Sequence, residues 1–221
     1  MDFTVTLMMS EFVTHDVRRF IVARPQGFEF EPGQGVELAI AAPEWQDQSR
    51  PFTPTSLKDD QVLEFTIKAY PEHNGVTRAL HQLRPGDNLL MSKPFGTIRY
   101  KGPGVFIAGG AGITPFIAIV RDLSRKQKLA HQGMIFSNKT PADIICEKEL
   151  RHAFGDKLVL TCTQSAAPGY AQRRIDKEFL TEHVSDFNQQ FYLCGPPGFM
   201  DAVTAALRDL GVEADSLVFE Q

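Results

Sequence analysis

Residues 105–115 read Val105-Phe106-Ile107-Ala108-Gly109-Gly110-Ala111-Gly112-Ile113-Thr114-Pro115. The four apolar residues predict a short buried strand, and the glycines after them predict a tight turn. Pro115 suits the first turn of a following helix, where its missing N–H is not needed. Glycines at such a turn let the backbone approach a pyrophosphate, and the start of the helix offers N–H groups to the anion.

Pro115 stands at the third glycine position of the standard G-x-G-x-x-G pattern. An ordinary glycine-rich turn between a strand and a helix is therefore the alternative interpretation. The glycines are not followed by G-K-[ST], which argues against a P-loop nucleotidase.

Downstream of this turn, predicted strands and helices alternate, a pattern typical of a parallel sheet with helices on both faces. The predicted strands are Val105–Ala108, Gly133–Phe136, Leu158–Cys162 and Phe191–Leu193, and the predicted helices are Pro115–Leu123, Glu147–Phe154, Ile175–Glu182 and Pro197–Leu210.

A second loop, Tyr192-Leu193-Cys194-Gly195-Pro196-Pro197-Gly198, also ends a predicted strand and opens a predicted helix. Open α/β sheets bind ligands at the carboxyl ends of their strands, so both loops are expected to share one crevice. Cys194 would lie near the ligand there. No base at a suitable spacing marks it as a nucleophile, so we interpret it as a residue that shapes the site.

The first hundred residues are rich in β-branched and aromatic runs separated by turn signals, which predicts a small antiparallel barrel. The predicted strands are Thr4–Met8, Val17–Ala23, Gly35–Ile40 and Leu63–Ala69, with one helix at Val76–Leu83. The segment Lys101-Gly102-Pro103-Gly104 is a plausible linker. We therefore expect a barrel domain at residues 1–100 and an α/β domain at residues 101–221.

The composition limits the possible classes of protein. Hydrophobic residues make up 43% of the 221 and charged residues 23%, which argues against disorder. The chain has no apolar run of membrane-spanning length and no secretory signal at Met1-Asp2-Phe3-Thr4, so we expect a cytoplasmic protein without a membrane segment. The net charge of −4 argues against nucleic-acid binding. Cys146, Cys162 and Cys194 are far apart and match neither an iron–sulfur nor a zinc pattern, so no metal is expected.

Positive charge is concentrated between His73 and Lys101, where five basic residues accompany the single acidic residue Asp87. The five are Arg78, Arg84, Lys93, Arg99 and Lys101. An ordinary solvated face is one interpretation. The other is a site for phosphates or for an acidic electron-carrier protein.

Four further motifs accompany the glycine turn in a characteristic order: Arg50-Pro51-Phe52-Thr53, Gly75-Val76-Thr77, Pro94-Phe95-Gly96 and Cys194-Gly195-Pro196-Pro197. As a set they resemble the ferredoxin–NADP reductase superfamily, in particular the compact branch with cytochrome b5 reductase and bacterial flavodoxin or ferredoxin reductases. The resemblance covers nearly the whole chain. It implies an FAD-binding barrel followed by an α/β domain that binds NADH or NADPH.

The resemblance assigns flavin-binding roles to the Arg50–Thr53 motif. Arg50 would pair with the flavin phosphate, and Phe52, which replaces the family's usual tyrosine, would pack on the isoalloxazine ring next to Pro51. Thr53 would offer a hydrogen bond near N5, the atom that accepts the hydride. A barrel strand with a buried Phe52 is the alternative.

Other segments of the first domain would complete the flavin site. The resemblance implies flavin contacts from Thr66, Ile67, Lys68 and Tyr70, although an ordinary strand explains them equally well. Gly75, Val76 and Thr77 would bind the pyrophosphate, which favours FAD over FMN. Lys93-Pro94-Phe95-Gly96 matches the family's Gly-Pro-x-Gly turn except at Lys93. Thr114 would reach back toward the flavin, and Phe219 would either shield it or belong to a last core strand.

The second domain would bind the nicotinamide dinucleotide. The residues implied are Gly109, Gly110, Gly112, Ile113, Asn138, Lys139, Cys194, Gly195, Pro196 and Pro197. The segment around Asn138 resembles the Asn-x-Thr pattern of NADH-using relatives, and we favour NADH. Lys139 with Arg173 or Arg174 could still bind the 2′-phosphate of NADPH.

The resemblance implies hydride transfer from NAD(P)H to FAD, with Thr53 and Cys194 at the reacting centre, and then electron transfer to a separate acceptor. The acceptor could be ferredoxin, flavodoxin, a cytochrome, an oxygenase component or free flavin, and a monomer is expected. An electron-transfer subunit without independent activity is the main alternative. A binding or sensor module that has lost its chemistry is a third.

Overall fold

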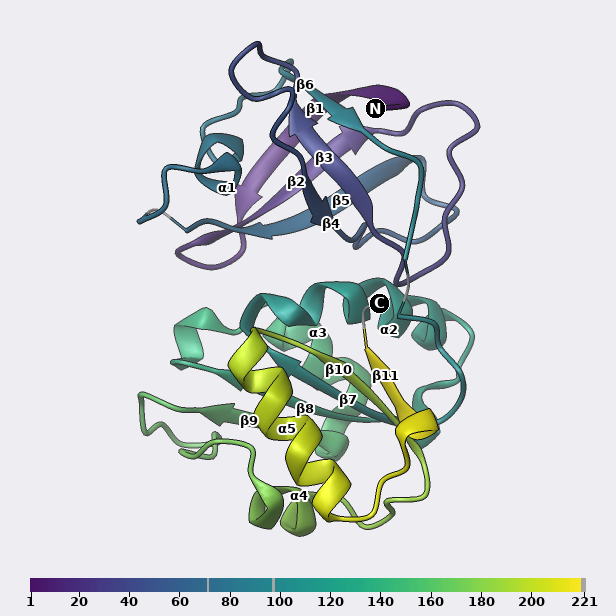
Figure 1. Ribbon diagram of the computed structural model, residues 1–221, viewed down its shortest axis with the longest axis vertical. Coiled ribbons are helices and arrows are strands. Elements are labelled where there is room, and N and C mark those ends of the chain that lie inside the picture. The colour runs from purple at the N-terminus through teal and green to yellow at the C-terminus, as the bar shows by residue number, and fades with distance from the viewer. Residues whose placement is uncertain (71, 97, 220–221) are drawn as a thin grey trace. The chain divides into compact units, whose positions relative to one another are not determined.

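The computed structural model describes residues 1–70, 72–96 and 98–219 (Figure 1). The chain divides into two compact units. The first comprises Met1–Thr97 together with Thr114–Asp122, and the second comprises Ile98–Ile113 together with Leu123–Gln221. The predicted boundary at residue 100 stays a prediction.

The first unit is built on a six-stranded antiparallel sheet in the order β4-β3-β6-β1-β2-β5. Its strands are β1 (Phe3–Phe12), β2 (Val17–Ala23), β3 (Val36–Ile40), β4 (Arg50–Phe52), β5 (Val62–Lys68) and β6 (Asn88–Met91). The long strand β1 pairs with β6 through residues 3–6 and with β2 through residues 7–12, and its register shifts between Leu7 and Met9. Such a bulge bends a strand, so β1 can serve both neighbours.

The sheet closes on itself where the chain leaves β4. Pro54 forms an antiparallel bridge with Phe65 of β5, and the Thr55 amide donates to the Glu64 carbonyl at 2.7 Å. The predicted antiparallel barrel is therefore confirmed. Strand β6, four residues long, was not predicted, and the three-residue β4 was anticipated only by the alternative interpretation of Phe52 as a residue of a barrel strand.

The barrel core is filled by the alternate residues of its strands. The buried members are Val5, Leu7, Phe20, Val22, Phe28, Phe30, Val36, Leu38, Ile40, Leu63, Phe65, Ile67, Val76, Ala79, Leu80, Leu89 and Met91. Three of these residues, Val76, Ala79 and Leu80, belong to α1 (Val76–Leu80), which packs its apolar side chains on this core. The prediction extended this helix to Leu83, but it ends at Leu80 and His81 occupies the C-cap.

The second unit has a five-stranded parallel sheet in the order β11-β10-β7-β8-β9, which confirms the predicted α/β fold. The strands are β7 (Gly104–Gly109), β8 (Gly133–Asn138), β9 (Leu158–Cys162), β10 (Gln190–Cys194) and β11 (Leu217–Phe219). The chain runs from β7 outward to β8 and β9, and then returns to the other side of β7 with β10. The strand order thus reverses between β7 and β10.

Helices cover both faces of the sheet, because successive residues of each strand point to opposite faces. Figure 1 shows α5 (Pro197–Asp209) across one face, and its Val203 and Leu207 share a core with Ile107 and with Phe179 of α4 (Lys177–His183). On the other face Phe106 packs edge-on against Phe154 of α3 (Glu147–Phe154), with ring centroids 6.4 Å apart. The remaining helix, α2 (Thr114–Arg125), follows the short 3-10 turn Gly110–Ile113, and its first nine residues group with the first unit.

A buried tyrosine holds the start of the second unit. The Tyr192 hydroxyl accepts from the amides of Lys101 and Gly102 at 2.9 and 3.0 Å, and it donates to the Gly102 carbonyl at 2.7 Å. Gln132 adds a second tie, because its side chain accepts from the Gly104 amide at 3.1 Å and donates to the Tyr100 hydroxyl at 2.8 Å. The segment at residues 100–104 is therefore bound to this sheet by side chains as well as by its own strand.

Among the residues that the structure describes, none of the helices combines the length and the apolar character needed to cross a bilayer.

His81 is a half-buried histidine that ties α1 to the barrel. Its ring lies edge-on to Phe20, with centroids 5.6 Å apart, and its Nε2 lies 2.8 Å from the carbonyl oxygen of Ile67. The backbone carbonyl of His81 accepts from Arg18 Nη1 at 2.6 Å. Burial, with a smaller contribution from the Arg18 charge, lowers the pKa of His81 below its ordinary value, although the Ile67 carbonyl and Asp16 oppose this.

The lowered pKa of His81 makes barrel stability depend on pH. The folded protein takes up this proton at a lower pH than the unfolded chain does, so the unfolded chain binds more protons as the pH falls through the unfolded pKa. We expect the free energy of unfolding to fall between about pH 7.5 and pH 5.5. The change should be smaller in His81→Gln, which keeps a donor but cannot titrate. Urea titrations at the two pH values check this, and an equal loss in both proteins would contradict it.

Candidate functional site

The glycine turn after β7 requires its glycines. Gly110 has a φ of +53°, in the left-handed region that favours glycine. A Cβ on Gly112 would lie 2.3 Å from the carbonyl oxygen of Cys194 and 2.7 Å from the amide nitrogen of Gly195. The turn and the loop after β10 are therefore in backbone contact. They meet at the carboxyl ends of β7 and β10, the two strands between which the strand order reverses.

The Phe199 ring packs against a glycine at the start of each loop. A Cβ on Gly109 would lie 3.0 Å from the Phe199 ring, and one on Gly195 would lie 2.5 Å from it. Phe199 is in the first turn of α5, just after the exposed Pro196 and Pro197. Sequence reasoning did not select Phe199. Phe199 belongs to no recognised motif. Its role is visible only in the structure, where Gly109 and Gly195 both pack against its ring.

Other predicted dinucleotide residues lie at the same edge of the sheet. Cys194 is half-buried at the end of β10, opposite Ala108 in register, while Ile113 is fully buried in the core. Asn138 ends β8 and is only 5% exposed, and its amide nitrogen and oxygen have no hydrogen-bond partner within the described chain. Lys139, the next residue, is exposed.

Asn138 pairs in register with Cys162, the last residue of β9. Burial raises the pKa of the Cys162 thiol, and the nearby Asp143 and Glu147 carboxylates raise it further. A thiol of this kind stays protonated at neutral pH, which makes it a packing residue rather than a nucleophile.

Arg173, one of the two arginines considered for a 2′-phosphate, is engaged by carboxylates. Its guanidinium donates to Glu182 at 2.8 Å and to Asp176 at 3.0 Å. Asp176 also caps α4 by accepting from the Phe179 amide at 2.8 Å. The other arginine, Arg174, is exposed.

The two segments of the first unit with the predicted flavin contacts are joined just after the first of them. Pro54, which directly follows the segment Arg50–Thr53, is bridged antiparallel to Phe65 of β5. Phe52 is partly buried and packs on the barrel core, Thr53 is half-buried, and Arg50 and Pro51 are exposed.

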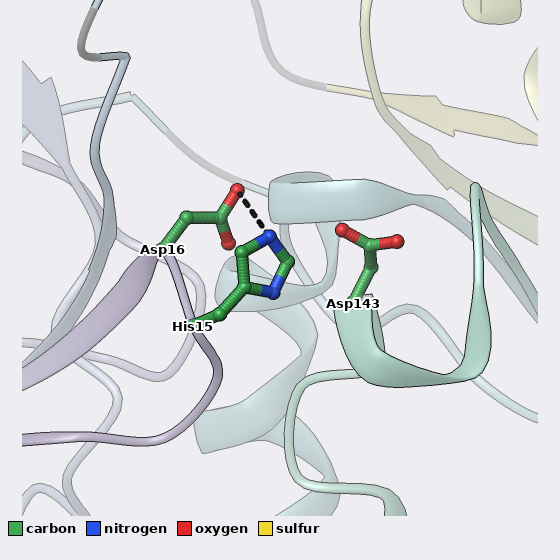
Figure 2. Close-up of side chains that lie close together, drawn as sticks. All are labelled: His15, Asp16 and Asp143. Atoms are coloured by element: carbon green, nitrogen blue, oxygen red, sulfur yellow. Dashed lines mark ion pairs between the residues drawn. The ribbon is translucent and has the colours of Figure 1, made fainter.

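Within β5 the predicted contacts have different surroundings. Thr66 is 6% exposed and the Ile67 side chain is buried in the core, while Tyr70, two residues after the strand ends, is 41% exposed. Lys68 Nζ lies 2.6 Å from Asp16 Oδ2, and His15 Nε2 lies 3.6 Å from the same carboxylate oxygen (Figure 2).

Lys68 also sets the ionisation of Asp16. Burial alone would raise the pKa of this carboxyl, but the hydrogen bond and charge of Lys68 outweigh it, so the net pKa is lowered. The Lys68 ammonium is therefore paired with a carboxylate at neutral pH.

The start of α1 supplies the predicted pyrophosphate contacts. Gly75 is the N-cap in an extended conformation, and the Val76 side chain is buried in the barrel core. Thr77 is half-buried. Of the two remaining predicted flavin contacts, Thr114 begins α2, and Phe219, 39% exposed, ends β11 beside Leu193.

Sequence reasoning also missed a buried polar group next to Thr53. Thr55 is fully buried, and its hydroxyl donates to Glu64 Oε1 at 2.7 Å and contacts the Thr66 hydroxyl at 3.2 Å. Arg121 Nη1 donates to the Thr55 carbonyl at 2.7 Å and to Glu64 Oε1 at 2.6 Å. Pro51 and Pro54, which have no amide to donate, are the only hint of this in the sequence.

Two protein-family models match the chain. Residues 4–100 match the oxidoreductase FAD-binding domain, and residues 106–205 match the oxidoreductase NAD-binding domain.

The chain is similar in sequence to reductases from bacteria and fungi. It is 27% identical over 221 residues to the ferredoxin–NAD(P)(+) reductase component of the naphthalene 1,2-dioxygenase system of Pseudomonas putida, which covers 96% of this chain and 66% of the relative. It is 29% identical over 243 residues to NADH-cytochrome b5 reductase 2 of Candida glabrata, covering 92% and 78%. The chain therefore spans just under two thirds of the first of these relatives.

Solved structures share the fold. The FAD/NAD-binding domain of nitric oxide dioxygenase from Vibrio cholerae has a TM-score of 0.86 at 20% identity, covering 98% of this chain and 97% of that one. A ferredoxin NADP+ reductase from Neisseria gonorrhoeae with bound FAD and NADP has a TM-score of 0.85 at 19% identity, covering 99% and 97%.

The contact between Gly112 and Cys194 predicts a contrast between two glycine substitutions. Gly112→Ala places a methyl group against main-chain atoms that cannot yield cheaply, so we expect a destabilisation of about 2 kcal/mol or more and loss of dinucleotide binding. Gly198→Ala meets no atom within 4 Å and lies in a helix, so it should be neutral or slightly stabilising. Thermal melts and dinucleotide titrations of both variants check this, and equal behaviour of the two would contradict it.

Proposed function

Because the chain belongs to the ferredoxin–NADP reductase superfamily, with its FAD-binding and NAD-binding domains in order, we propose that it oxidises NADH with FAD and passes the electrons to a separate acceptor. The flavin would be held within residues 1–100 and the dinucleotide within residues 101–221. The observation that carries the proposal is the backbone contact of Gly112 with Cys194 and Gly195. The contact requires that Gly112 have no Cβ, and it holds the glycine turn against the loop after β10 at the carboxyl ends of the strands.

The residues present suit both cofactors. Within the turn Gly110–Ile113, Gly110 and Gly112 have no Cβ that would keep an anion away from the backbone N–H groups, which fits a pyrophosphate. Arg50 is exposed and available for a flavin phosphate, and the half-buried Thr53 lies beside the strand that contains Thr66. FAD, when bound, would accept a hydride at N5 and release electrons to the acceptor.

The protein's own contribution would be orientation. Thr53 would hold the ring by a hydrogen bond near N5, and Phe52 would pack against the ring. Cys194 and Gly195 would line the nicotinamide position. Hydride transfer needs no general base, so orientation and exclusion of water would supply most of the rate.

The surroundings of Arg173 support NADH as the reductant. A guanidinium already shared by Glu182 and Asp176 would have to leave two carboxylates to bind a 2′-phosphate. Lys139 and Arg174 are exposed and supply charge without a built pocket. We therefore propose NADH over NADPH.

The acceptor would be a separate protein. The names of the relatives include a ferredoxin reductase component and a cytochrome b5 reductase. The five basic residues between Arg78 and Lys101 are all exposed, which supports an acidic docking partner. We further propose a cytoplasmic monomer that binds no nucleic acid, in keeping with the net charge of −4.

Flavin reduction tests the proposed activity. The purified chain loaded with FAD should be yellow and should bleach on addition of NADH, and more slowly with NADPH. Thr53→Ala should slow bleaching about tenfold, the effect of about 1.4 kcal/mol at the transition state, while Thr53→Ser should retain the rate. A chain that binds neither FAD nor FMN would end the proposal. A chain that binds FAD but reduces no dye acceptor would favour the electron-transfer subunit.

Salt dependence tests the docking face. With an acidic ferredoxin as acceptor, kcat/KM should fall steeply as ionic strength rises, and Arg84→Glu should lower it several-fold at low salt. Lys148→Glu reverses an exposed charge on α3 and serves as the matched control. Neither variant should change dye reduction. A rate indifferent to salt, or equal losses in both variants, would exclude docking on this stretch.

A further inference from the structure

The strand that carries the predicted flavin contacts is weakly held by its own ladder. Strand β4 has only three residues and pairs with β3 alone. Pro51 and Pro54 cannot donate a backbone hydrogen bond, so two of the five residues from Arg50 to Pro54 contribute no N–H to the sheet. The position of Thr53 must therefore depend on what holds the chain immediately after it.

Thr55 fixes the chain immediately after Thr53, and every polar group of Thr55 forms a hydrogen bond. Its amide donates to the Glu64 carbonyl at 2.7 Å, its carbonyl accepts from Arg121 Nη1 at 2.7 Å, and its hydroxyl donates to Glu64 Oε1 at 2.7 Å. Because the single hydroxyl proton goes to the carboxylate, the Thr66 hydroxyl is the donor in the 3.2 Å contact. A fully buried residue with all its groups bonded has one position available to it.

Glu64 is held in turn by two arginines. Its Oε1 lies 2.6 Å from Arg121 Nη1, and its Oε2 lies 3.7 Å from Arg19 Nη1. The Glu64 side chain is 12% exposed and that of Arg121 is 20% exposed, so solvent screens the pair only partly. The Ser56 hydroxyl accepts from the Glu64 amide at 3.1 Å, which extends the same junction by one residue.

We propose that Thr55 is a positioning residue that sets the placement of Thr53 relative to the flavin ring, through its bonds to Glu64, Thr66 and Arg121. The inference rests on the proposed function. Thr55 lies two residues after Thr53 and bonds to Thr66 of β5, so it links the two segments that would contact the flavin. A displacement of about 1 Å at a reacting centre can cost roughly 100-fold in rate, so an orienting contact of this kind has a measurable effect.

The test is Thr55→Val, which keeps the shape of the side chain and removes the hydroxyl. With FAD loaded, we expect the rate of flavin reduction at saturating NADH to fall about 10- to 100-fold, the KM for NADH to stay unchanged, and the flavin midpoint potential to shift. Thr55→Ser, which restores the hydroxyl, should recover most of the rate and the potential. Stopped-flow absorbance and spectroelectrochemistry supply the readouts.

The matched control is Thr161→Val. Thr161 is also fully buried, and its hydroxyl donates to backbone carbonyls of the second unit, including that of Ala171 at 3.1 Å. It should lose stability while keeping the wild-type rate and potential. A Thr55→Val protein that binds FAD and reacts at the wild-type rate and potential would overturn the inference.

Glu64→Gln provides a second route should Thr55→Val not fold. It retains an oxygen acceptor and removes the charge, and it should slow flavin reduction at constant KM. Wild-type rates in this variant would also overturn the inference. A wild-type protein that binds no flavin would instead refute the proposed function, so the two failures are distinguishable.

Discussion

The barrel depends on one junction, where the chain after β4 meets β5 through Thr55 and Glu64. Two prolines remove backbone donors from this stretch, and the ladder alone could not set its register. Side-chain hydrogen bonds to a partly buried carboxylate take over that task. The cost of burying Glu64 is offset because both of its oxygens face positive charge. The segment that would contact a flavin is thereby attached to a buried, fully hydrogen-bonded residue of the first unit.

The second unit solves a related problem by the opposite means. Where the barrel uses side-chain bonds to place a strand, the sheet uses the absence of side chains to bring two loops together. Gly112 can touch the carbonyl of Cys194 only because it has no Cβ, and Gly109 and Gly195 accept the Phe199 ring for the same reason. The result is a close backbone contact between two loops at the point where the strand order reverses, which is where open α/β sheets bind their ligands.

Local patterns predicted much of this architecture from the sequence. Strands β2 and β9 and helix α3 have the predicted bounds, because their hydrophobic periodicity is clear and their ends carry turn residues. Helix α4 begins at Lys177 rather than at Ile175, because Asp176 caps it, a signal that was present in the sequence. Strand β6 was missed, and β4 was only an alternative interpretation, because both are too short to show an alternation. Thr55, Phe199 and Arg121 were missed for another reason: each acts through a partner distant in sequence, and no spacing rule reports such a partner.

The ties formed by Tyr192 determine where the chain can be divided. Its phenol satisfies two amides and one carbonyl of residues 101 and 102, and its ring stacks on Tyr100 at 5.9 Å and on Phe106 at 4.7 Å. A fragment that starts at residue 98 keeps these partners. One that starts at residue 104 leaves a buried hydroxyl with nothing to bond, at a cost of about 1–3 kcal/mol. Expression of the α/β half alone should therefore be sensitive to a difference of six residues at its amino end.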